Sequence, residues 1–170
     1  VAHGFYTDDH GKTFHLSQDL ALPGSNEATA AVLSGNTLMM NARNQKGDVK
    51  ARIVARSSDG GATWNSTGFD NNLPDPVCEG TLLELGIKKG KQWLAFCNAA
   101  DTLRRDNLTL RISDDEGRSW KKSILIDRST ESKKDFTAYS DIVRLDKKRI
   151  GVLYERNGYA EIVFTCINWK

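Results

Sequence analysis

Three copies of an eight-residue pattern constrain the fold of this chain more than any other feature. The copies span residues 7–14, 57–64 and 113–120, and each reads Ser or Thr, any residue, Asp, any residue, Gly, any residue, Thr or Ser, aromatic. They begin about 50 to 56 residues apart, which is the length of one unit in many repeat proteins. The pattern therefore predicts an architecture of repeated units, with one copy in each unit.

The residue types in the pattern favour a tight turn. The Asp side chain can accept hydrogen bonds from backbone N–H groups ahead of it, and Gly supplies the positive φ of a hairpin. A calcium-binding loop is the alternative, since adjacent aspartates occur at residues 8–9 and 114–115. Such a loop needs acidic ligands at alternate positions and a closing Glu over about twelve residues, and the copies lack them. We therefore predict three hairpin turns.

The segments around these turns have the pattern of strands. Short runs rich in branched and aromatic residues alternate with clusters of Gly, Asn, Asp and Lys. Eight strands are predicted, at residues 37–43, 51–57, 91–98, 108–113, 123–127, 141–145, 149–155 and 161–169. Residues 17–32 are interpreted as mostly loop, with at most one irregular strand. With the repeat spacing, these runs predict an all-β propeller with one blade per repeat.

Composition and charge exclude several classes of protein. The 170 residues are 39% hydrophobic and 27% charged, which fits one globular domain over residues 1–170. The 24 basic and 22 acidic residues are interspersed, unlike the basic surface of a nucleic-acid-binding protein. No apolar run approaches the roughly 18 residues of a membrane helix. The start, VAHG, has no signal-peptide character and no Met, so we expect the chain to be cut from a longer one.

The cysteines and histidines do not have the spacing of a metal site. Cys78, Cys97 and Cys166 lie far apart without a CxxC pair, and the three histidines all lie near the N-terminus. This distribution argues against zinc. Cys97 and Cys166 lie in apolar runs, so we expect buried free thiols there. The odd number of cysteines leaves open whether one disulfide forms, and therefore which redox compartment the chain occupies.

The repeated turn is the Asp-box, and the chain resembles the C-terminal half of the catalytic propeller of exo-α-sialidases (neuraminidases). Five further motifs between the boxes follow the order of that family: NE at 26–27, NARN at 41–44, RDNLT at 105–109, AYSDI at 138–142 and YE at 154–155. The family's propeller has six blades, so the resemblance implies that this chain supplies about half of them.

The resemblance implies that Tyr139, Glu27 and Glu155 are catalytic. Tyr139 is expected to be the nucleophile, Glu27 the carboxylate paired with it, and Glu155 the carboxylate that orients the first arginine of a substrate-binding triad. Sialic acid carries a carboxylate on its anomeric carbon, and a neutral tyrosine approaches it without charge repulsion; sialidases are the Tyr-nucleophile exception among glycosidases. Glu27 would accept the phenolic proton. This chemistry calls for no metal and no cofactor.

The resemblance also implies that Arg43 and Arg105 bind the substrate carboxylate, as the second and third arginines of that triad. A guanidinium group is planar and permanently charged, and it can bind a carboxylate at two points. Arg104 is the alternative to Arg105, although the two-residue offset before Asn107 favours Arg105. Residues 73–80 resemble a Pro-Asp-Pro-x-Cys stretch of the family, to which we assign no chemistry beyond a shaped loop.

Two elements of the family are missing from the sequence: an Arg-Ile-Pro segment with the first arginine of the triad, and the aspartic acid that serves as acid/base. We therefore expect the N-terminal half of the same propeller as a partner, and a sialylated glycoconjugate as the substrate. The predicted activity is exo-sialidase, with trans-sialylation and a non-catalytic carbohydrate-binding propeller as alternatives. A secreted, periplasmic or lysosomal location is expected.

Overall fold

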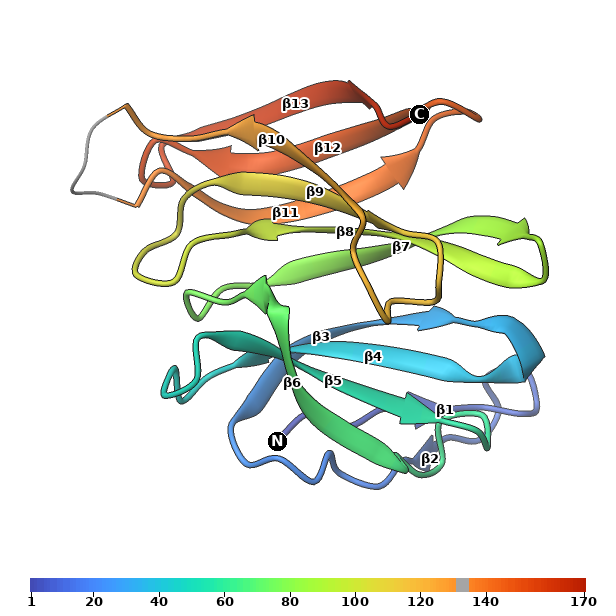
Figure 1. Ribbon diagram of the computed structural model, residues 1–170. Helices are drawn as coiled ribbons and strands as arrows, with labels where there is room; N and C mark the ends of the chain where they lie inside the picture. The colour runs from blue at the N-terminus through green and yellow to red at the C-terminus, as the bar shows by residue number, and fades with distance from the viewer. Residues whose placement is uncertain (131–134) are drawn as a thin grey trace.

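The computed structural model describes residues 1–130 and 135–170, and its regular structure is almost entirely antiparallel sheet (Figure 1). The first large sheet contains β3 (Ser25–Val32), β4 (Leu38–Asn44), β5 (Ala51–Ser57) and β6 (Ser66–Pro74). The second contains β7 (Gly80–Lys88), β8 (Lys91–Ala99), β9 (Leu108–Ser113) and β10 (Lys122–Asp127). The third contains β11 (Thr137–Arg144), β12 (Arg149–Arg156) and β13 (Glu161–Asn168). In each sheet, strands adjacent in sequence pair with one another, as in a propeller blade.

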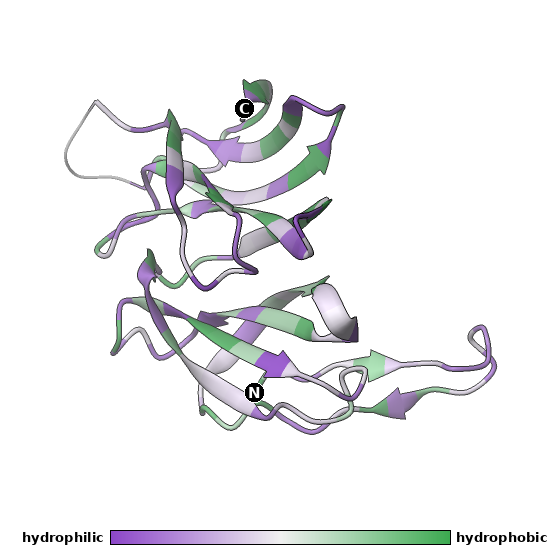
Figure 2. Ribbon diagram, turned by 45° about the vertical axis from the view of Figure 1, so that its right-hand side comes forward, coloured by the Kyte–Doolittle hydropathy of each residue, from purple (hydrophilic) through white to green (hydrophobic). Residues whose placement is uncertain are grey.

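Two short strands and a single 3-10 turn complete the regular structure of the described residues. β1 (Phe5–Tyr6) pairs with β2 (His15–Leu16), and η1 (Ser34–Asn36) joins β3 to β4. The β1–β2 ribbon projects from the rest of the molecule in Figure 2. The part of the chain that the structure describes contains no helix long and apolar enough to span a membrane.

The three large sheets stack face to face, with the two termini at opposite ends of the stack (Figure 1). Apolar side chains fill the space between neighbouring sheets, because each strand directs alternate residues to opposite faces. Met39, Leu94 and Phe96 lie in the core between the first and second sheets. Leu110 and Val152 belong to the core between the second and third sheets. Adjacent blades therefore stabilise one another.

The three repeated turns have the same hydrogen bonds. In each copy the central Asp accepts from the hydroxyl two residues before it, and from the backbone N–H and hydroxyl of the residue four positions after it, at 2.6 to 3.0 Å. The bonds from Thr13 and Thr63 lower the pKa of Asp9 and Asp59 to about 2. The copies join β1 to β2, β5 to β6 and β9 to β10. The prediction of hairpin turns is confirmed.

The all-β prediction is confirmed, and all eight predicted strands are present. Five strands were missed or underrated, among them the two-residue strands β1 and β2. β6 and β7 were not predicted, and β3 is a regular eight-residue strand within a region interpreted as mostly loop. β11 also begins at Thr137 rather than at residue 141, so Tyr139 lies within a strand and not before one. Of these strands, β3 carries Glu27 and β7 follows directly after Glu79, and both residues belong to the site described below.

One expectation about the cysteines is wrong. Cys78 and Cys97 are buried, but Cys166 is exposed, and all three thiols are free. Cys166 lies on β13, where exposed and partly buried residues alternate along the whole strand. Its side of the strand also carries Ile162 and Phe164, which are 67% and 56% exposed. The apolar run therefore belongs to an uncovered sheet face, and the thiol is exposed with it.

A buried ion pair fixes the loop between β6 and β7. Asp75 accepts from the backbone N–H of Asn44 at 2.8 Å and of Cys78 at 3.0 Å. Its carboxylate lies 3.5 Å from Arg52 Nη1, and both side chains are completely buried. The loop, residues 75–79, is thereby attached to the first sheet at one defined position.

We expect Asp75→Ala to lower the free energy of unfolding by about 3–5 kcal/mol, because it leaves the buried Arg52 charge without its partner. The measurement is chemical denaturation of both proteins. Asp146→Ala is the control, because its ion pair with Arg149 is exposed and should contribute little. Equal stability of Asp75→Ala and the parent would show that the pair does not hold the loop.

Candidate active site

Two bulged strands bring distant residues of the chain together. The pairing of β3 with β4 is irregular between Ser25 and Ala28, and that of β11 with β12 between Thr137 and Ser140. A bulge changes the direction in which a side chain points. Glu27 lies in the first irregular stretch and Tyr139 in the second. Both strands lie next to β7, so the two side chains can meet across the sheets.

The Tyr139 hydroxyl donates a hydrogen bond to Glu27 Oε1 at 2.5 Å, although the two residues are 112 positions apart. Arg43 Nη1 lies 2.7 Å from Glu27 Oε2 and donates to the Tyr139 hydroxyl at 3.0 Å. Arg43 Nη2 donates to Gln45 Oε1. The side chains of Arg43 and Glu27 are 11% and 35% exposed, so solvent screens the charge of Arg43 less than that of Glu27. The structure thus places a phenol, a carboxylate and a guanidinium group in mutual contact.

The surroundings of Tyr139 hold its proton. Burial raises the pKa of Tyr139, and the hydrogen bond to Glu27 and the negative charge of that residue raise it further, while Arg43 acts in the opposite direction. The phenol is therefore neutral at neutral pH. The Glu27 carboxylate accepts the hydrogen bond that this neutral phenol donates.

Arg105 lies over the ring of Tyr139. Its guanidinium carbon is 5.5 Å from the centre of the Tyr139 ring. Nη2 donates to the Val77 carbonyl at 3.0 Å, and Nη1 donates to the Tyr159 hydroxyl at 3.3 Å. Val77 has a φ of 63°, which a β-branched residue rarely adopts. Arg104 instead pairs with Asp106, at 3.3 Å. The guanidinium group that faces Tyr139 is that of Arg105.

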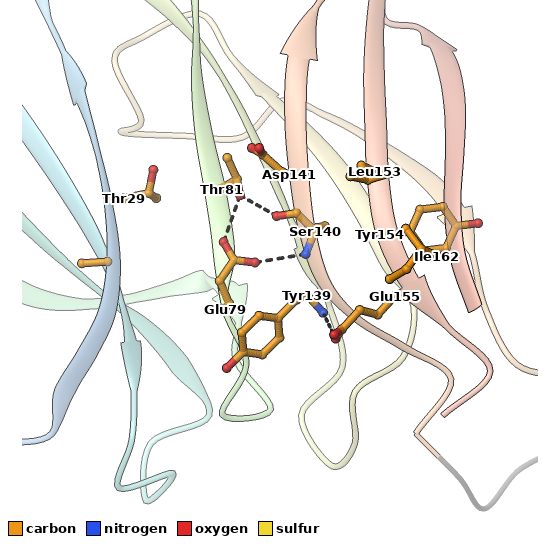
Figure 3. Close-up of a pocket in the computed structure, with 11 residues that line it drawn as sticks. Thr29, Glu79, Thr81, Tyr139, Ser140, Asp141, Leu153, Tyr154, Glu155 and Ile162 are labelled. Atoms are coloured by element: carbon orange, nitrogen blue, oxygen red, sulfur yellow. Dashed lines mark hydrogen bonds between the residues drawn. The ribbon is translucent and has the colours of Figure 1, made fainter. Parts of the chain in front are cut away.

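Two carboxylates accept from the backbone of the bulge in β11 (Figure 3). Glu155 Oε2 accepts from the Tyr139 N–H at 3.2 Å, and Glu79 Oε2 accepts from the Ser140 N–H at 3.1 Å. Both carboxylates, with Tyr139, line a cavity of about 500 Å³, whose other lining residues come from β3, β7, β11, β12 and β13. The bulge is thus held by Glu155 on β12 and by Glu79 in the loop before β7.

The structure brings together four of the five residues singled out from the sequence, namely Glu27, Arg43, Arg105 and Tyr139. Glu155 joins them through the backbone of Tyr139. Sequence reasoning missed Glu79, Gln45 and Tyr159, which contact the same groups. Glu79 lies within residues 73–80, which resemble a Pro-Asp-Pro-x-Cys stretch of the family. That resemblance is the one feature of the sequence that could have pointed to Glu79. Nothing in the sequence distinguished Gln45 or Tyr159.

This arrangement can activate a hydroxyl and bind an anion. Glu27 can accept the phenolic proton, while Arg43 places positive charge at the Tyr139 hydroxyl and Arg105 places it over the ring. Among residues 1–130 and 135–170, no group of three or more His, Cys, Asp or Glu side chains is arranged to hold a metal ion. The described residues thus present a phenol that is hydrogen-bonded to a carboxylate, with two guanidinium groups beside it.

The chain matches the model of the BNR repeat-like domain over residues 1–152. It is 32% identical to a sialidase of Bacteroides fragilis and 30% identical to a sialidase of Micromonospora viridifaciens, over 97% and 88% of its own length. Among solved structures, the Hadza microbial sialidase Hz136 superimposes with a TM-score of 0.79 at 28% identity, over 97% of this chain and 31% of that one.

These matches extend over nearly the whole chain but only part of each relative. The chain spans 30% of the Bacteroides sialidase and 23% of the Micromonospora sialidase. The blades described above are therefore a portion of a sialidase-type propeller. Their repeats, their motif order and their matches lead to one conclusion: the chain belongs to the BNR repeat-like domain family, within the exo-α-sialidases.

Proposed function

We propose that this chain carries the nucleophile side of an exo-α-sialidase active site, which releases terminal α-linked sialic acid from glycoconjugates with retention of configuration. The observation that carries the proposal is the 2.5 Å hydrogen bond from the Tyr139 hydroxyl to Glu27. An ordinary packing tyrosine does not need a partly buried carboxylate on its hydroxyl, whereas a nucleophilic tyrosine needs a base in this position.

The proposed reaction has two steps. In the first, Tyr139 Oη bonds to the anomeric carbon, the glycosidic bond breaks, and the phenolic proton moves to Glu27. The leaving oxygen takes a proton from an acid that we assign to the remaining blades. In the second, water attacks the anomeric carbon and gives a proton to the group that acted as the acid, the bond to Tyr139 Oη breaks, and the phenol recovers its proton from Glu27. Two displacements at one carbon give overall retention.

The substrate carboxylate requires cationic groups near the anomeric centre. Arg43 and Arg105 flank Tyr139, so a carboxylate held between them would keep the anomeric carbon close to the phenol oxygen. We assign the first arginine of the triad to the remaining blades, together with the acid/base. Glu155 would orient that arginine. A location outside the cytoplasm, where sialylated glycoconjugates are found, is part of this proposal.

The test is hydrolysis of a fluorogenic α-sialoside by the protein with all of its blades. Proton NMR of the first product should show the α anomer before it equilibrates. Adding lactose to the assay distinguishes transfer to a sugar from transfer to water. A complete protein that binds sialosides but releases no fluorophore would contradict the proposal and favour a carbohydrate-binding propeller.

We expect Arg43→Lys and Arg105→Lys each to weaken binding of a sialic acid analogue by about tenfold or more, although both keep the positive charge. Lysine cannot offer a planar, two-point contact to a carboxylate. Arg105→Lys should also lose the contact with the Val77 carbonyl. The measurement is calorimetric titration with an analogue that has a free carboxylate.

Arg104→Lys is the matched control, because its guanidinium group pairs with Asp106 rather than facing Tyr139. It should bind the analogue as the parent does. Unchanged affinity in Arg43→Lys or Arg105→Lys would remove that arginine from the triad, and a larger loss in Arg104→Lys would transfer the role to Arg104.

A further inference from the structure

The Thr81 hydroxyl lies at the junction of two blades and contacts two acceptor oxygens. Its oxygen is 2.9 Å from Glu79 Oε1 and 2.6 Å from the Ser140 carbonyl oxygen (Figure 3). Glu79 Oε2 in turn accepts from the Ser140 N–H at 3.1 Å. Glu79 and Thr81 together therefore contact both the N–H and the C=O of Ser140, the residue that follows Tyr139.

The number of protons in this network determines the charge of Glu79. Both oxygen–oxygen distances are hydrogen-bond lengths, and each needs a proton between the two atoms. The Thr81 hydroxyl has one proton, and a carbonyl oxygen has none to give. If that proton lies on the shorter contact, toward Ser140, the proton between Thr81 and Glu79 must come from the Glu79 carboxyl group.

We infer that Glu79 holds its proton in the folded protein and, as a neutral acid, positions the Tyr139–Ser140 bulge; the inference rests on the function proposed above. Glu79 Oε1–H donates to the Thr81 hydroxyl, which donates to the Ser140 carbonyl. Glu79 Oε2 accepts from the Ser140 N–H. Each of these groups then has a partner, and the closed ring links the second sheet to the third at the proposed nucleophile.

The electrostatic surroundings agree with a neutral Glu79. Burial raises the pKa of Glu79, the nearby Glu27 charge raises it further, and the Ser140 N–H, the Thr81 hydroxyl and Arg52 act in the opposite direction. The ionisable groups around Glu79 come from several elements: Glu27 on β3, Arg52 on β5, Cys78 in the preceding loop, Cys97 on β8, Tyr139 and Asp141 on β11, and Tyr154 and Glu155 on β12.

A neutral Glu79 has a consequence for the reaction. Glu27 and Glu155 already place two carboxylates beside Tyr139. A third negative charge in the same cavity would hold the phenolic proton more tightly and slow its transfer. As a neutral acid, Glu79 supplies the hydrogen bonds that fix the bulge without adding that charge. It acts through Ser140, so it is a positioning residue and not a catalytic one.

The test compares Glu79→Gln with Glu79→Ala in the protein with all of its blades. The glutamine amide can donate to Thr81 and accept from Ser140, so it reproduces the neutral acid. We expect kcat within about threefold of the parent in Glu79→Gln, and a loss of about 10- to 100-fold in Glu79→Ala with little change in KM. Thr81→Val should resemble Glu79→Ala. Glu84→Gln is the control, because it makes the same change at an exposed carboxylate on β7.

The pH dependence provides the second measurement. Between the ordinary glutamate pKa of about 4.3 and the raised pKa in the fold, the folded protein keeps a proton that the unfolded chain has lost. The unfolding free energy of the parent, relative to Glu79→Gln, should therefore fall as pH rises through this window and then become constant. Activity should also fall as pH rises, and it should fall at a lower pH in the parent than in Glu79→Gln. The reason is that ionisation of Glu79 breaks its hydrogen bond to Thr81, whereas the glutamine amide does not ionise.

Two results would overturn the inference. One is a loss of kcat in Glu79→Gln as large as in Glu79→Ala, and the other is a stability difference that does not change with pH. The stability measurement needs no substrate. If the parent lacks sialidase activity but the pH-dependent difference is present, the proposed function fails while the protonation of Glu79 stands.

Discussion

Tyr139→Phe is expected to lower kcat for sialoside hydrolysis by more than about 10³-fold, while binding of a sialic acid analogue stays measurable. The change removes one oxygen atom, which is the atom proposed to attack the anomeric carbon. Arg43 and Arg105 remain, so the substrate carboxylate keeps its contacts. The measurement pairs steady-state kinetics with calorimetric titration of the same preparation.

Two controls make this result specific. Tyr6→Phe removes the same atom from β1, away from the cavity, and should leave kcat unchanged. Mass spectrometry of the protein trapped with a fluorinated sialoside should find the label on Tyr139 in the parent, and none in Tyr139→Phe. Near-normal turnover in the variant, or a label on another residue, would remove Tyr139 from the nucleophile role.

The sequence predicted strands best where both faces of a strand are packed. The predicted bounds of β5 and β9 agree with the structure to the residue, since these strands are rich in buried branched side chains. β6 was missed because it is an edge strand that contains Gly, Asp, Asn and Pro, all depleted in strands. β7 was missed because its leucines and lysine also favour helices. Pairing with neighbouring strands determines both.

The site was predictable in its residues but not in its geometry. Family motifs, in order, singled out Tyr139 and Glu27, yet neither the bulges nor the contact between them can be read from residues 112 positions apart. Glu79 has no pattern of its own. Its role depends on the contact between β7 and β11, where the Thr81 hydroxyl lies within hydrogen-bond distance of both Glu79 and the Ser140 carbonyl. Tertiary contacts of this kind are invisible to local propensity.

Residues 1–170 alone are expected to be inactive and to self-associate, because one face of the third sheet is uncovered. Val143, Leu153, Ile162 and Phe164 are between 47% and 67% exposed on this face. Blades normally bury such faces against the next blade, and patches of this kind otherwise cause association. We therefore expect an obligate interface of more than about 2,000 Å² with the remaining blades.

The measurement is light scattering and sialoside hydrolysis by residues 1–170, alone and joined to the remaining blades. Ile162→Lys with Phe164→Lys should make the isolated chain more monomeric but should destabilise the complete protein, because there the same face is covered. Leu103→Lys changes an apolar residue that is 89% exposed in a loop, and should do neither. A monodisperse, active monomer of residues 1–170 would contradict both the need for further blades and the assignment of the acid/base to them. The opposite effects of one double substitution in the two proteins would identify this face as the surface on which the next blade packs.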